Sequence, residues 1–422
     1  MYSIKQRRLP RWLVPLFPLA MLAAACTLGA LLLSSCGQEQ PIVPRTETFE
    51  AVPILRVLLT PTPVQMASLA TTGGYGVQID GSTVLSSTSP MPPTEVRRHG
   101  RQWRFNGLDL EGREVIVQPS GDSCVRNGQL AYRGMLQLLP EGDSAFGIVN
   151  HVDLESYLAG VLPKELLAGW SGETYGALAV AARTFALYHK RNFGASHDYD
   201  VGADQAWQVY GGISAESPKA WKAIRATHGI VLAYGPEGEE QIFMAQYSAC
   251  CGGHVNGAYV IRDAPRIEPL YGGQECDDCR RCPLYRWGTV RISKENLCRA
   301  IAAAYPSERS LDDVNEIRVT SEASSGRAVW LDVIGPRHAV RLRAEDLRLA
   351  LLRNGAPEAN KLYSMNCRIR VLADGVEFYD GRGFGHGVGL CQWGAQGKAE
   401  RSWTAQQILE FYYPGARLMK AY

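Results

Sequence analysis

Glycine alternates with larger residues near the C-terminal end of the chain, where residues 381–397 read GRGFGHGVGLCQWGAQG. A β-strand turns successive side chains to opposite faces, so a strand here would have one face of bare backbone. Glycine weakens a strand, and a glycine face indicates close approach by a ligand or by another backbone segment. The pattern therefore predicts a glycine-rich C-terminal strand, and both explanations for its glycines stay open.

Two side chains that suit a carbohydrate follow these glycines directly. Gln392 offers an amide for hydrogen bonds, and Trp393 offers a broad indole face. Beside a flat glycine surface, they favour binding of a sugar polymer. A cysteine hydrolase is disfavoured, because His386 and Cys391 are five residues apart and would face opposite sides of a strand.

The first 36 residues have the pattern of an export signal. Basic residues up to Arg11 precede an apolar run from Trp12 to Leu33, and residues 33–36 read LSSC, which resembles a bacterial lipobox. We expect residues 1–35 to be a lipoprotein signal peptide and Cys36 to carry the lipid that anchors the protein to a membrane. An uncleaved membrane helix is the alternative, because the run approaches the ~20 residues that a span needs. Either way, the rest of the chain works outside the cytoplasm, in the cell envelope.

Composition places the chain among ordinary globular proteins. Its 422 residues are enough for two or three modest domains, with 46% hydrophobic and 20% charged residues. The net charge of +2 gives no general attraction to nucleic acid, which we do not expect as a partner.

The predicted fold class is α+β. Residues 36–53 contain three prolines and are predicted to be a tether. Residues 54–150 form a β-rich N-terminal part, and residues 151–422 form a mixed helix and strand core that contains the site. The N-terminal strands are expected at 54–59, 75–79, 114–117, 135–139 and 147–149.

Helices are predicted mainly in the second half. One covers 153–161 and stops at Leu162-Pro163, and a stronger one begins at Ser171 and carries an apolar stripe to about Lys190. The other expected elements are helices at 217–227, 295–305 and 344–352, a last helix capped by Thr404 and Gln407, and strands at 230–233 and 241–248.

Glu165 is the first candidate for chemistry. It follows the predicted helix break, near Trp170, and a carboxyl group beside apolar side chains has a raised pKa and can act as a general acid. A surface or capping glutamate is the alternative. Arg183 lies beside the apolar stripe of the next helix, where it either forms a structural ion pair or holds Glu165 or a sugar oxygen.

Several short motifs occur in a fixed order along the chain. They are LPKE at 162–165, AVAART at 179–184, QVYGG at 208–212, Tyr247-Ser248 with Gly252-Gly253, the segment 383–395, and YYPG at 412–415. Together they resemble the stage II sporulation protein D family, whose members are also described as amidase enhancers. The resemblance covers about residues 49–422.

The resemblance implies binding of peptidoglycan and lytic transglycosylase activity on glycan strands stripped of peptides, with Glu165 as the catalytic acid and base. No cofactor is required for that catalysis. A non-catalytic protein that binds glycan and stimulates a cell-wall amidase is the alternative. The substrate-binding candidates are Arg183, Gln208, Tyr210, Ser248, His386, Gln392 and Trp393.

Cysteines cluster between residues 250 and 282. Cys251, Cys276, Cys279 and Cys282 have spacings that suit a structural zinc ion, whereas disulfides suit an exported protein equally well. Some members of the family carry metal-binding cysteines just before the QVYGG segment. Residues 200–207 contain none here, which argues against that site in this chain.

Replacing the predicted lipid-bearing cysteine tests the export hypothesis. Cys36→Ser should abolish lipid labelling and leave unprocessed precursor, because the thiol that accepts the lipid is gone. Metabolic labelling with a fatty acid and immunoblotting for precursor provide the measurement. Normal processing of the variant, or a natural protein without lipid, would refute lipidation.

Overall fold

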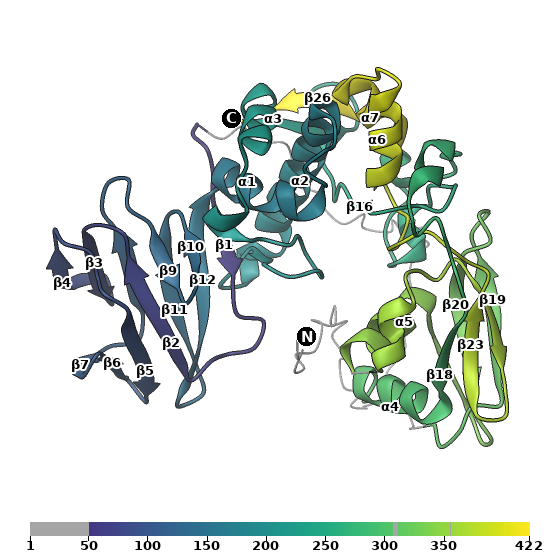
Figure 1. The fold of residues 1–422 in the computed structure, drawn as a ribbon, viewed down its shortest axis with the longest axis horizontal. Helices are drawn as coiled ribbons and strands as arrows, with labels where there is room; N and C mark the ends of the chain where they lie inside the picture. Colours follow the sequence, from purple (N-terminus) through teal and green to yellow (C-terminus); the bar gives the residue numbers. More distant parts are fainter. Residues whose placement is uncertain (1–49, 307–310, 355) are drawn as a thin grey trace, which may run out of the picture.

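The computed structural model describes residues 50–306, 311–354 and 356–422 (Figure 1). The predicted signal peptide, Cys36 and most of the tether lie outside these residues. The described part contains seven α-helices and 26 strands, which confirms the α+β class. Within it, no helix combines the length and the apolar character that a membrane span needs. Figure 1 shows a β-rich N-terminal part, a helical middle and a third part of mixed structure.

The N-terminal part consists of two sheets, almost entirely antiparallel, that share one hydrophobic core. One sheet has the order β13-β1-β12-β11-β8-β3-β4, and the other has the order β10-β9-β2-β5-β6-β7. In the first sheet, β1 pairs parallel with β13. The strands are β1 (Ile54–Leu58), β2 (Met66–Thr71), β3 (Tyr75–Ile79), β4 (Ser82–Ser87), β5 (Thr94–His99), β6 (Gln102–Phe105), β7 (Leu108–Glu111), β8 (Val115–Pro119), β9 (Val125–Asn127), β10 (Leu130–Tyr132), β11 (Met135–Glu141), β12 (Ala145–Asp153) and β13 (Val201–Gly202).

The five strands predicted for this part are confirmed as β1, β3, β8, β11 and β12. The sequence missed most of the second sheet, because its strands are short and several, such as β7, expose most of their residues. β12 leads directly into the first helix: the Asp153 carboxylate accepts a hydrogen bond from the Ser156 amide at 2.9 Å and caps that helix. The sheet therefore sets where the helical part begins.

The helical middle contains α1 (Leu154–Glu165), α2 (Gly172–Asn192), α3 (Pro218–Ala226), α6 (Gln392–Glu400) and α7 (Ala405–Tyr412). The predicted end of the first helix at Leu162-Pro163 is wrong. Pro163 lies inside α1, which continues to Glu165, so less than one helical turn follows the proline. The capping box of Thr404 and Gln407 at the start of α7 is confirmed.

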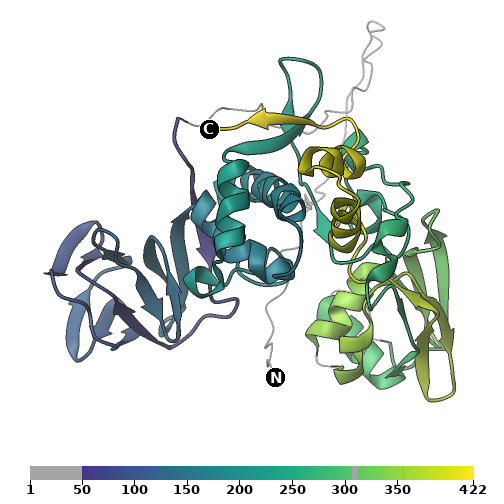
Figure 2. The ribbon, with the colours of Figure 1, turned by 45° about the horizontal axis from the view of Figure 1, so that its top comes forward.

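A small sheet joins this middle to the end of the chain. β14 (Ile230–Tyr234) pairs antiparallel with β26 (Arg417–Lys420) and with the two-residue strand β15 (Gln241–Ile242). Figure 2 shows β26 running alongside the helices to the C-terminus. The last strand of the chain is thereby held against the helical middle.

A buried ion pair fixes α1 to α2. The Arg183 guanidinium is fully buried and donates to both carboxylate oxygens of Glu155, at 2.9 and 2.7 Å. It also donates to the Ile230 carbonyl oxygen at 3.0 Å, while the amide of Gly229 and the hydroxyl of Tyr422 donate to Glu155. Burial alone would raise the pKa of Glu155, but the hydrogen bond and charge of Arg183 outweigh it and lower that pKa.

The third part has its own hydrophobic core inside the range that the sequence treated as one unit. Two three-stranded sheets, β18-β23-β22 and β19-β20-β21, pack with two helices (Figure 1). Its elements are β18 (Val290–Ser293), α4 (Lys294–Ala304), β19 (Glu316–Glu322), β20 (Ala328–Ile334), β21 (Ala339–Arg343), α5 (Ala344–Arg353), β22 (Arg368–Val371) and β23 (Gly375–Tyr379). Two short pairings lie beside this part. β17 (Arg286–Trp287) pairs with β24 (Gly381–Arg382) at its boundary, and β16 (Tyr247–Ser248) pairs with β25 (Leu390–Cys391) within the middle.

The glycine-rich segment is not the strand that its alternation predicted. Two of its dipeptides pair as β24 and β25, whereas Phe384 and Val388 form only isolated bridges. Four of its glycines have positive φ angles between 66° and 90°. A Cβ at Gly389 would lie 2.0 Å from the Gln246 carbonyl oxygen, and one at Gly383 would lie 2.6 Å from the Cys250 carbonyl oxygen. The glycines therefore admit the protein's own backbone, in a left-handed conformation that other residues rarely adopt.

Removing the buried cation should destabilise the helical middle. We expect Arg183→Met to lower the free energy of unfolding by about 3–5 kcal/mol, because Glu155 is left buried without its charged partner. Urea unfolding followed by circular dichroism measures this loss. As a control, Arg104→Met breaks the exposed Arg104–Asp109 pair and should leave the unfolding midpoint unchanged. Equal midpoints for both variants would contradict this role of Arg183.

Candidate functional site

The carboxyl group of Glu165 lies at the C-terminal end of α1, between two distant segments of the chain. Its Oε1 accepts a hydrogen bond from the Val209 amide at 3.2 Å, and its Oε2 accepts one from Gln392 Nε2 at 3.1 Å. The side chain of Gln392 is buried, whereas Glu165 stays partly exposed. Solvent therefore reaches a residue whose carboxyl group is oriented through both oxygens.

Burial raises the pKa of Glu165, and the hydrogen bonds from Val209 and Gln392 oppose that rise without cancelling it. Among the described residues, no second carboxyl group contributes to this shift. Tyr157 and Tyr247 are close enough for the Glu165 charge to raise their pKa values in addition to burial. The site therefore combines one carboxyl group whose pKa is raised with two neutral phenols.

Gln208 and Tyr210 were predicted to bind glycan. Both are buried, and they hold the backbone next to the site. Gln208 accepts a hydrogen bond from the Tyr157 hydroxyl at 3.1 Å and donates to the Ala182 carbonyl oxygen at 3.3 Å. The Tyr210 hydroxyl donates to Asn150 Oδ1 at 3.0 Å. Their contacts position the intervening Val209, whose amide binds Glu165.

Ser248 and His386 support the glycine-rich segment. The buried Ser248 hydroxyl oxygen accepts a hydrogen bond from the Gly387 amide at 3.2 Å, and His386 Nδ1 accepts one from the Val388 amide at 3.1 Å. Burial lowers the pKa of His386 to about 4; Glu345 opposes that change. The imidazole is therefore neutral at pH 7, with its remaining proton on Nε2.

Arg183 does not contact Glu165, contrary to one of the two roles that the sequence offered. Its guanidinium is fully buried and pairs with Glu155 at the opposite end of α1. A fully buried side chain cannot hold a sugar oxygen in this conformation. The other predicted role, a structural ion pair, is the one that the structure has.

An aromatic pair lies next to the Glu165 helix end. The rings of Trp170 and Trp393 meet edge to face, with 5.1 Å between their centroids. Trp393 is partly exposed, and its amide donates to the Ala249 carbonyl oxygen at 3.0 Å. It thus presents apolar surface close to Gln392, the residue that binds Glu165.

Four thiols that could hold a metal gather beneath α6. The sulfur atoms of Cys251, Cys276, Cys279 and Cys391 all lie within 4.8 Å of one another. Three of these residues were predicted ligands, but the predicted Cys282 is replaced in this group by Cys391. All nine cysteines among the described residues are free thiols.

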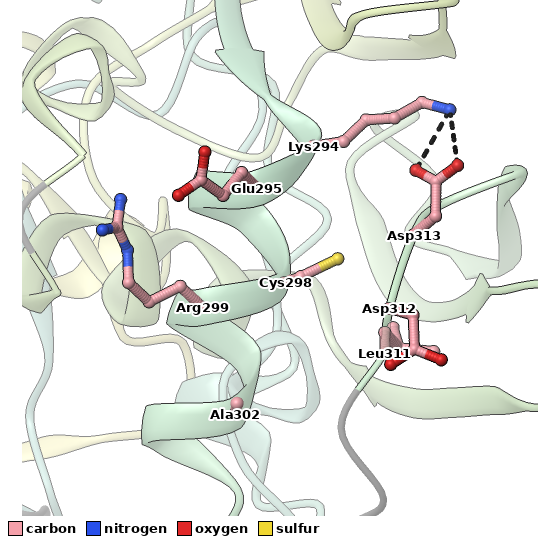
Figure 3. A pocket seen from close by; sticks show the side chains of 8 residues that line it. All are labelled: Lys294, Glu295, Cys298, Arg299, Ala302, Leu311, Asp312 and Asp313. Atoms are coloured by element: carbon pink, nitrogen blue, oxygen red, sulfur yellow. Dashed lines mark hydrogen bonds and ion pairs between the residues drawn. The ribbon is translucent and has the colours of Figure 1, made fainter.

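A pocket also lies in the third part, between α4 and the residues before β19 (Figure 3). Its charged lining includes Lys294, which pairs with Asp313 at 3.3 Å, and Asp312. Figure 1 places α4 in a different part of the molecule from α1 and α6. None of its lining residues belongs to a motif of the sequence analysis, so the pocket is separate from the Glu165 site.

Sequence reasoning missed Tyr157 and Tyr247 as neighbours of Glu165. Tyr247 directly precedes Ser248 in one of the family motifs, and the parallel pairing of β16 with β25 brings it beside Leu390. Tyr157 lies about two turns before Glu165 on α1. That helical spacing was a usable signal for Tyr157, whereas nothing in the sequence indicated the β16–β25 pairing.

Comparison with known proteins identifies the family of this chain. A model of the stage II sporulation protein family matches residues 142–234, which include Glu165 and Val209, and a model described as a domain of unknown function matches residues 268–389. An uncharacterized protein of Brachyspira hyodysenteriae is 30% identical over 347 residues, which are 82% of this chain and 86% of that protein.

Two relatives in Bacillus subtilis are similar at 25% identity. Stage II sporulation protein D aligns over 65% of this chain and 76% of its own length, and the amidase enhancer aligns over 62% of this chain and 40% of its own length. The chain belongs to the family of stage II sporulation protein D and amidase enhancers.

The raised pKa of Glu165 has a consequence for stability. A carboxyl group whose pKa is higher in the folded than in the unfolded state stabilises the fold below its unfolded pKa of about 4.3, and this contribution is lost as the pH rises through the folded pKa. We therefore expect the melting temperature of Glu165→Gln, measured relative to that of the natural protein, to be higher at about pH 8 than at about pH 4.

Differential scanning fluorimetry at both pH values provides the measurement. Glu111 is 75% exposed, so Glu111→Gln should leave the melting temperature unchanged at either pH. A pH-independent difference between Glu165→Gln and the natural protein would show that Glu165 is charged at no cost to the fold.

Proposed function

We propose that this protein is an exported, lipid-anchored lytic transglycosylase that cleaves the glycan strands of peptidoglycan and forms 1,6-anhydromuramic ends. The observation that carries the proposal is Glu165, a partly exposed residue whose carboxyl group has a raised pKa and is oriented by Val209 and Gln392. Membership in the family of stage II sporulation protein D supports it. The proposed chemistry requires no cofactor, because one side chain supplies both the acid and the base.

A single carboxyl group suits this reaction better than it suits hydrolysis. Glycosidases that use water or a covalent intermediate require two carboxyl groups, about 5–9.5 Å apart. Among the described residues, the influences on the Glu165 carboxyl are burial and two neutral amides. One group that first donates and then accepts a proton is enough when the sugar supplies its own nucleophile.

The reaction balances with Glu165 alone. Protonated Glu165 gives its proton to the glycosidic oxygen as the bond from the muramic acid C1 to that oxygen breaks. The 6-hydroxyl oxygen of the same sugar then bonds to C1, and its proton passes to the Glu165 carboxylate. The acid is regenerated, and water is not consumed.

Tyr157 and Tyr247 bring no charge to the Glu165 carboxyl group. Both hydroxyls stay neutral because burial raises their pKa values well above 10. They therefore leave the pKa of Glu165 raised by burial, which is the direction that a general acid needs.

Binding of the glycan is assigned to the surface around Trp393. Its partly exposed indole packs on Trp170 and adjoins Gln392, so a sugar stacked there would lie near the Glu165 carboxyl. The buried residues Gln208, Tyr210 and Ser248 act indirectly, through the backbone that they hold.

A non-catalytic glycan-binding role is the second candidate. It is favoured by similarity to a protein named amidase enhancer. The Trp170–Trp393 pair also favours it, because these rings offer a surface for binding a sugar but no catalytic group. In that case, a cell-wall amidase is the partner, and Glu165 only supports the binding surface.

Substitution of Glu165 separates the two candidates. On peptide-free glycan strands, Glu165→Gln should release 1,6-anhydromuramic ends about 10²–10⁴ times more slowly, because the amide cannot donate the proton, while strand binding persists. Trp393→Ala should instead weaken binding, because the stacking surface is lost. Mass spectrometry of the products and a pull-down with insoluble glycan measure the two effects.

The matched control is Glu111→Gln, which removes an exposed carboxyl group of the β-rich part and should cleave at the natural rate. If the natural protein and Glu165→Gln both leave glycan intact and stimulate an amidase equally, the enhancer role is correct. Reducing ends without anhydro products would identify a hydrolase.

A further inference from the structure

Four cysteine side chains from three separate segments meet directly beneath α6. Cys251 follows β16, Cys276 directly precedes the short 3-10 helix Asp277–Arg281, Cys279 lies within that helix, and Cys391 ends β25. All four are fully buried, and their sulfur atoms lie within 4.8 Å of one another. Chain segments separated by up to 140 residues therefore place their thiols at one point.

The spacing of these sulfur atoms matches tetrahedral metal coordination. Zinc binds thiolates at about 2.3 Å, which puts neighbouring sulfurs of a tetrahedron about 3.8 Å apart. The sulfurs of Cys251 and Cys279 are 3.6 Å apart. Four thiolates in this geometry are typical of zinc or of iron–sulfur chemistry.

Two backbone amides hold the sulfur of Cys391 in place. This residue is the N-cap of α6, and its sulfur accepts hydrogen bonds from the amides of Gly394 at 3.4 Å and Cys251 at 3.3 Å. These hydrogen bonds fix the position of the Cys391 sulfur among the four clustered thiols.

Glycine at position 394 is required by the same cluster. A Cβ there would lie 2.5 Å from the Cys276 sulfur and 2.1 Å from the Tyr412 hydroxyl oxygen. The Tyr412 hydroxyl is itself 3.2 Å from the Cys276 sulfur. The cluster is thus closely enclosed, with no room for a further ligand at Gly394.

We propose that Cys251, Cys276, Cys279 and Cys391 bind one zinc ion, and that this ion fixes Gln392 against Glu165. Each thiol releases its proton to solvent when it binds the metal. Four protein ligands leave no open position, so the ion is structural. Cys282, which the cysteine spacing favoured as the fourth ligand, lies outside the site.

The link to Glu165 is short and direct, and it rests on the proposed function. Gln392 follows Cys391 in the chain and donates to Glu165 Oε2 at 3.1 Å. Further along α6, Gln396 Oε1 accepts from the Ser171 amide at 2.9 Å and from the Thr174 hydroxyl at 3.0 Å. The metal holds the first turn of α6, and α2 holds the second.

Metal analysis of the purified full chain tests the site. The natural protein should contain about one zinc per chain, and a strong chelator should lower its melting temperature, because metal binding contributes folding free energy. Cys391→Ser should lose the zinc, whereas the matched variants Cys282→Ser and Cys250→Ser should keep it. Retention by Cys391→Ser with loss from Cys282→Ser would overturn the assignment.

Cobalt substitution tests the natural protein without relying on folded variants. Co²⁺ introduced in place of zinc should show intense thiolate-to-metal charge-transfer absorption and the visible bands of a tetrahedral site. Weak absorption typical of oxygen ligands, iron in the purified protein, or absence of metal with these thiols paired as disulfides would overturn the proposal.

Cleavage assays then separate this inference from the proposed function. Cys391→Ser should lose glycan cleavage along with its zinc, whereas Cys282→Ser should keep both. A natural protein that binds zinc but cleaves nothing would refute the transglycosylase and leave the metal site intact. A natural protein that cleaves glycan but contains no metal would refute the metal site and leave the transglycosylase standing.

Discussion

The buried pair of Arg183 and Glu155 is the interaction on which the helical middle depends. It joins α1, α2 and β14, and it also receives the Tyr422 hydroxyl from the C-terminus. Two charges withdrawn from water are stable only when their hydrogen bonds are satisfied, so the elements that supply them must stay together. α1 is fixed at its first turn and capped by Asp153. This fixed start sets the position of its C-terminal end, where the carboxyl group of Glu165 lies.

At that point, two segments far away in the sequence complete the site. Val209 comes from the loop before α3, and Gln392 lies 227 residues beyond Glu165 at the start of α6. The start of α6 depends in turn on the glycine-rich segment, whose left-handed glycines let it run against the backbone of residues 246–250. The glycines therefore act on the site indirectly, through the position of Gln392.

Local signals predicted much of the fold. The amphipathic stripe of α2, the caps of α2 and α7 and five strands of the first sheet were correct, because each depends on residues close together in the chain. The predicted end of α1 was wrong, because a proline in the last turn of a helix removes little hydrogen bonding. The prediction of a glycine-rich strand was also wrong. Glycine at every second position fits a strand and a segment of left-handed glycines equally well, and only the backbone contacts distinguish them.

By itself, the sequence determined which residues are candidates for chemistry: Glu165 and its motif, Gln392, Trp393 and the cysteines were all identified from type and spacing. Only the tertiary structure decided what each one touches. It paired Arg183 with Glu155, set Gln392 on Glu165, and put Cys391 in place of Cys282 among the four clustered thiols. The reason is physical: hydrogen bonds and sulfur contacts act over a few ångströms, and the chain brings residues more than a hundred positions apart within that range only when it folds.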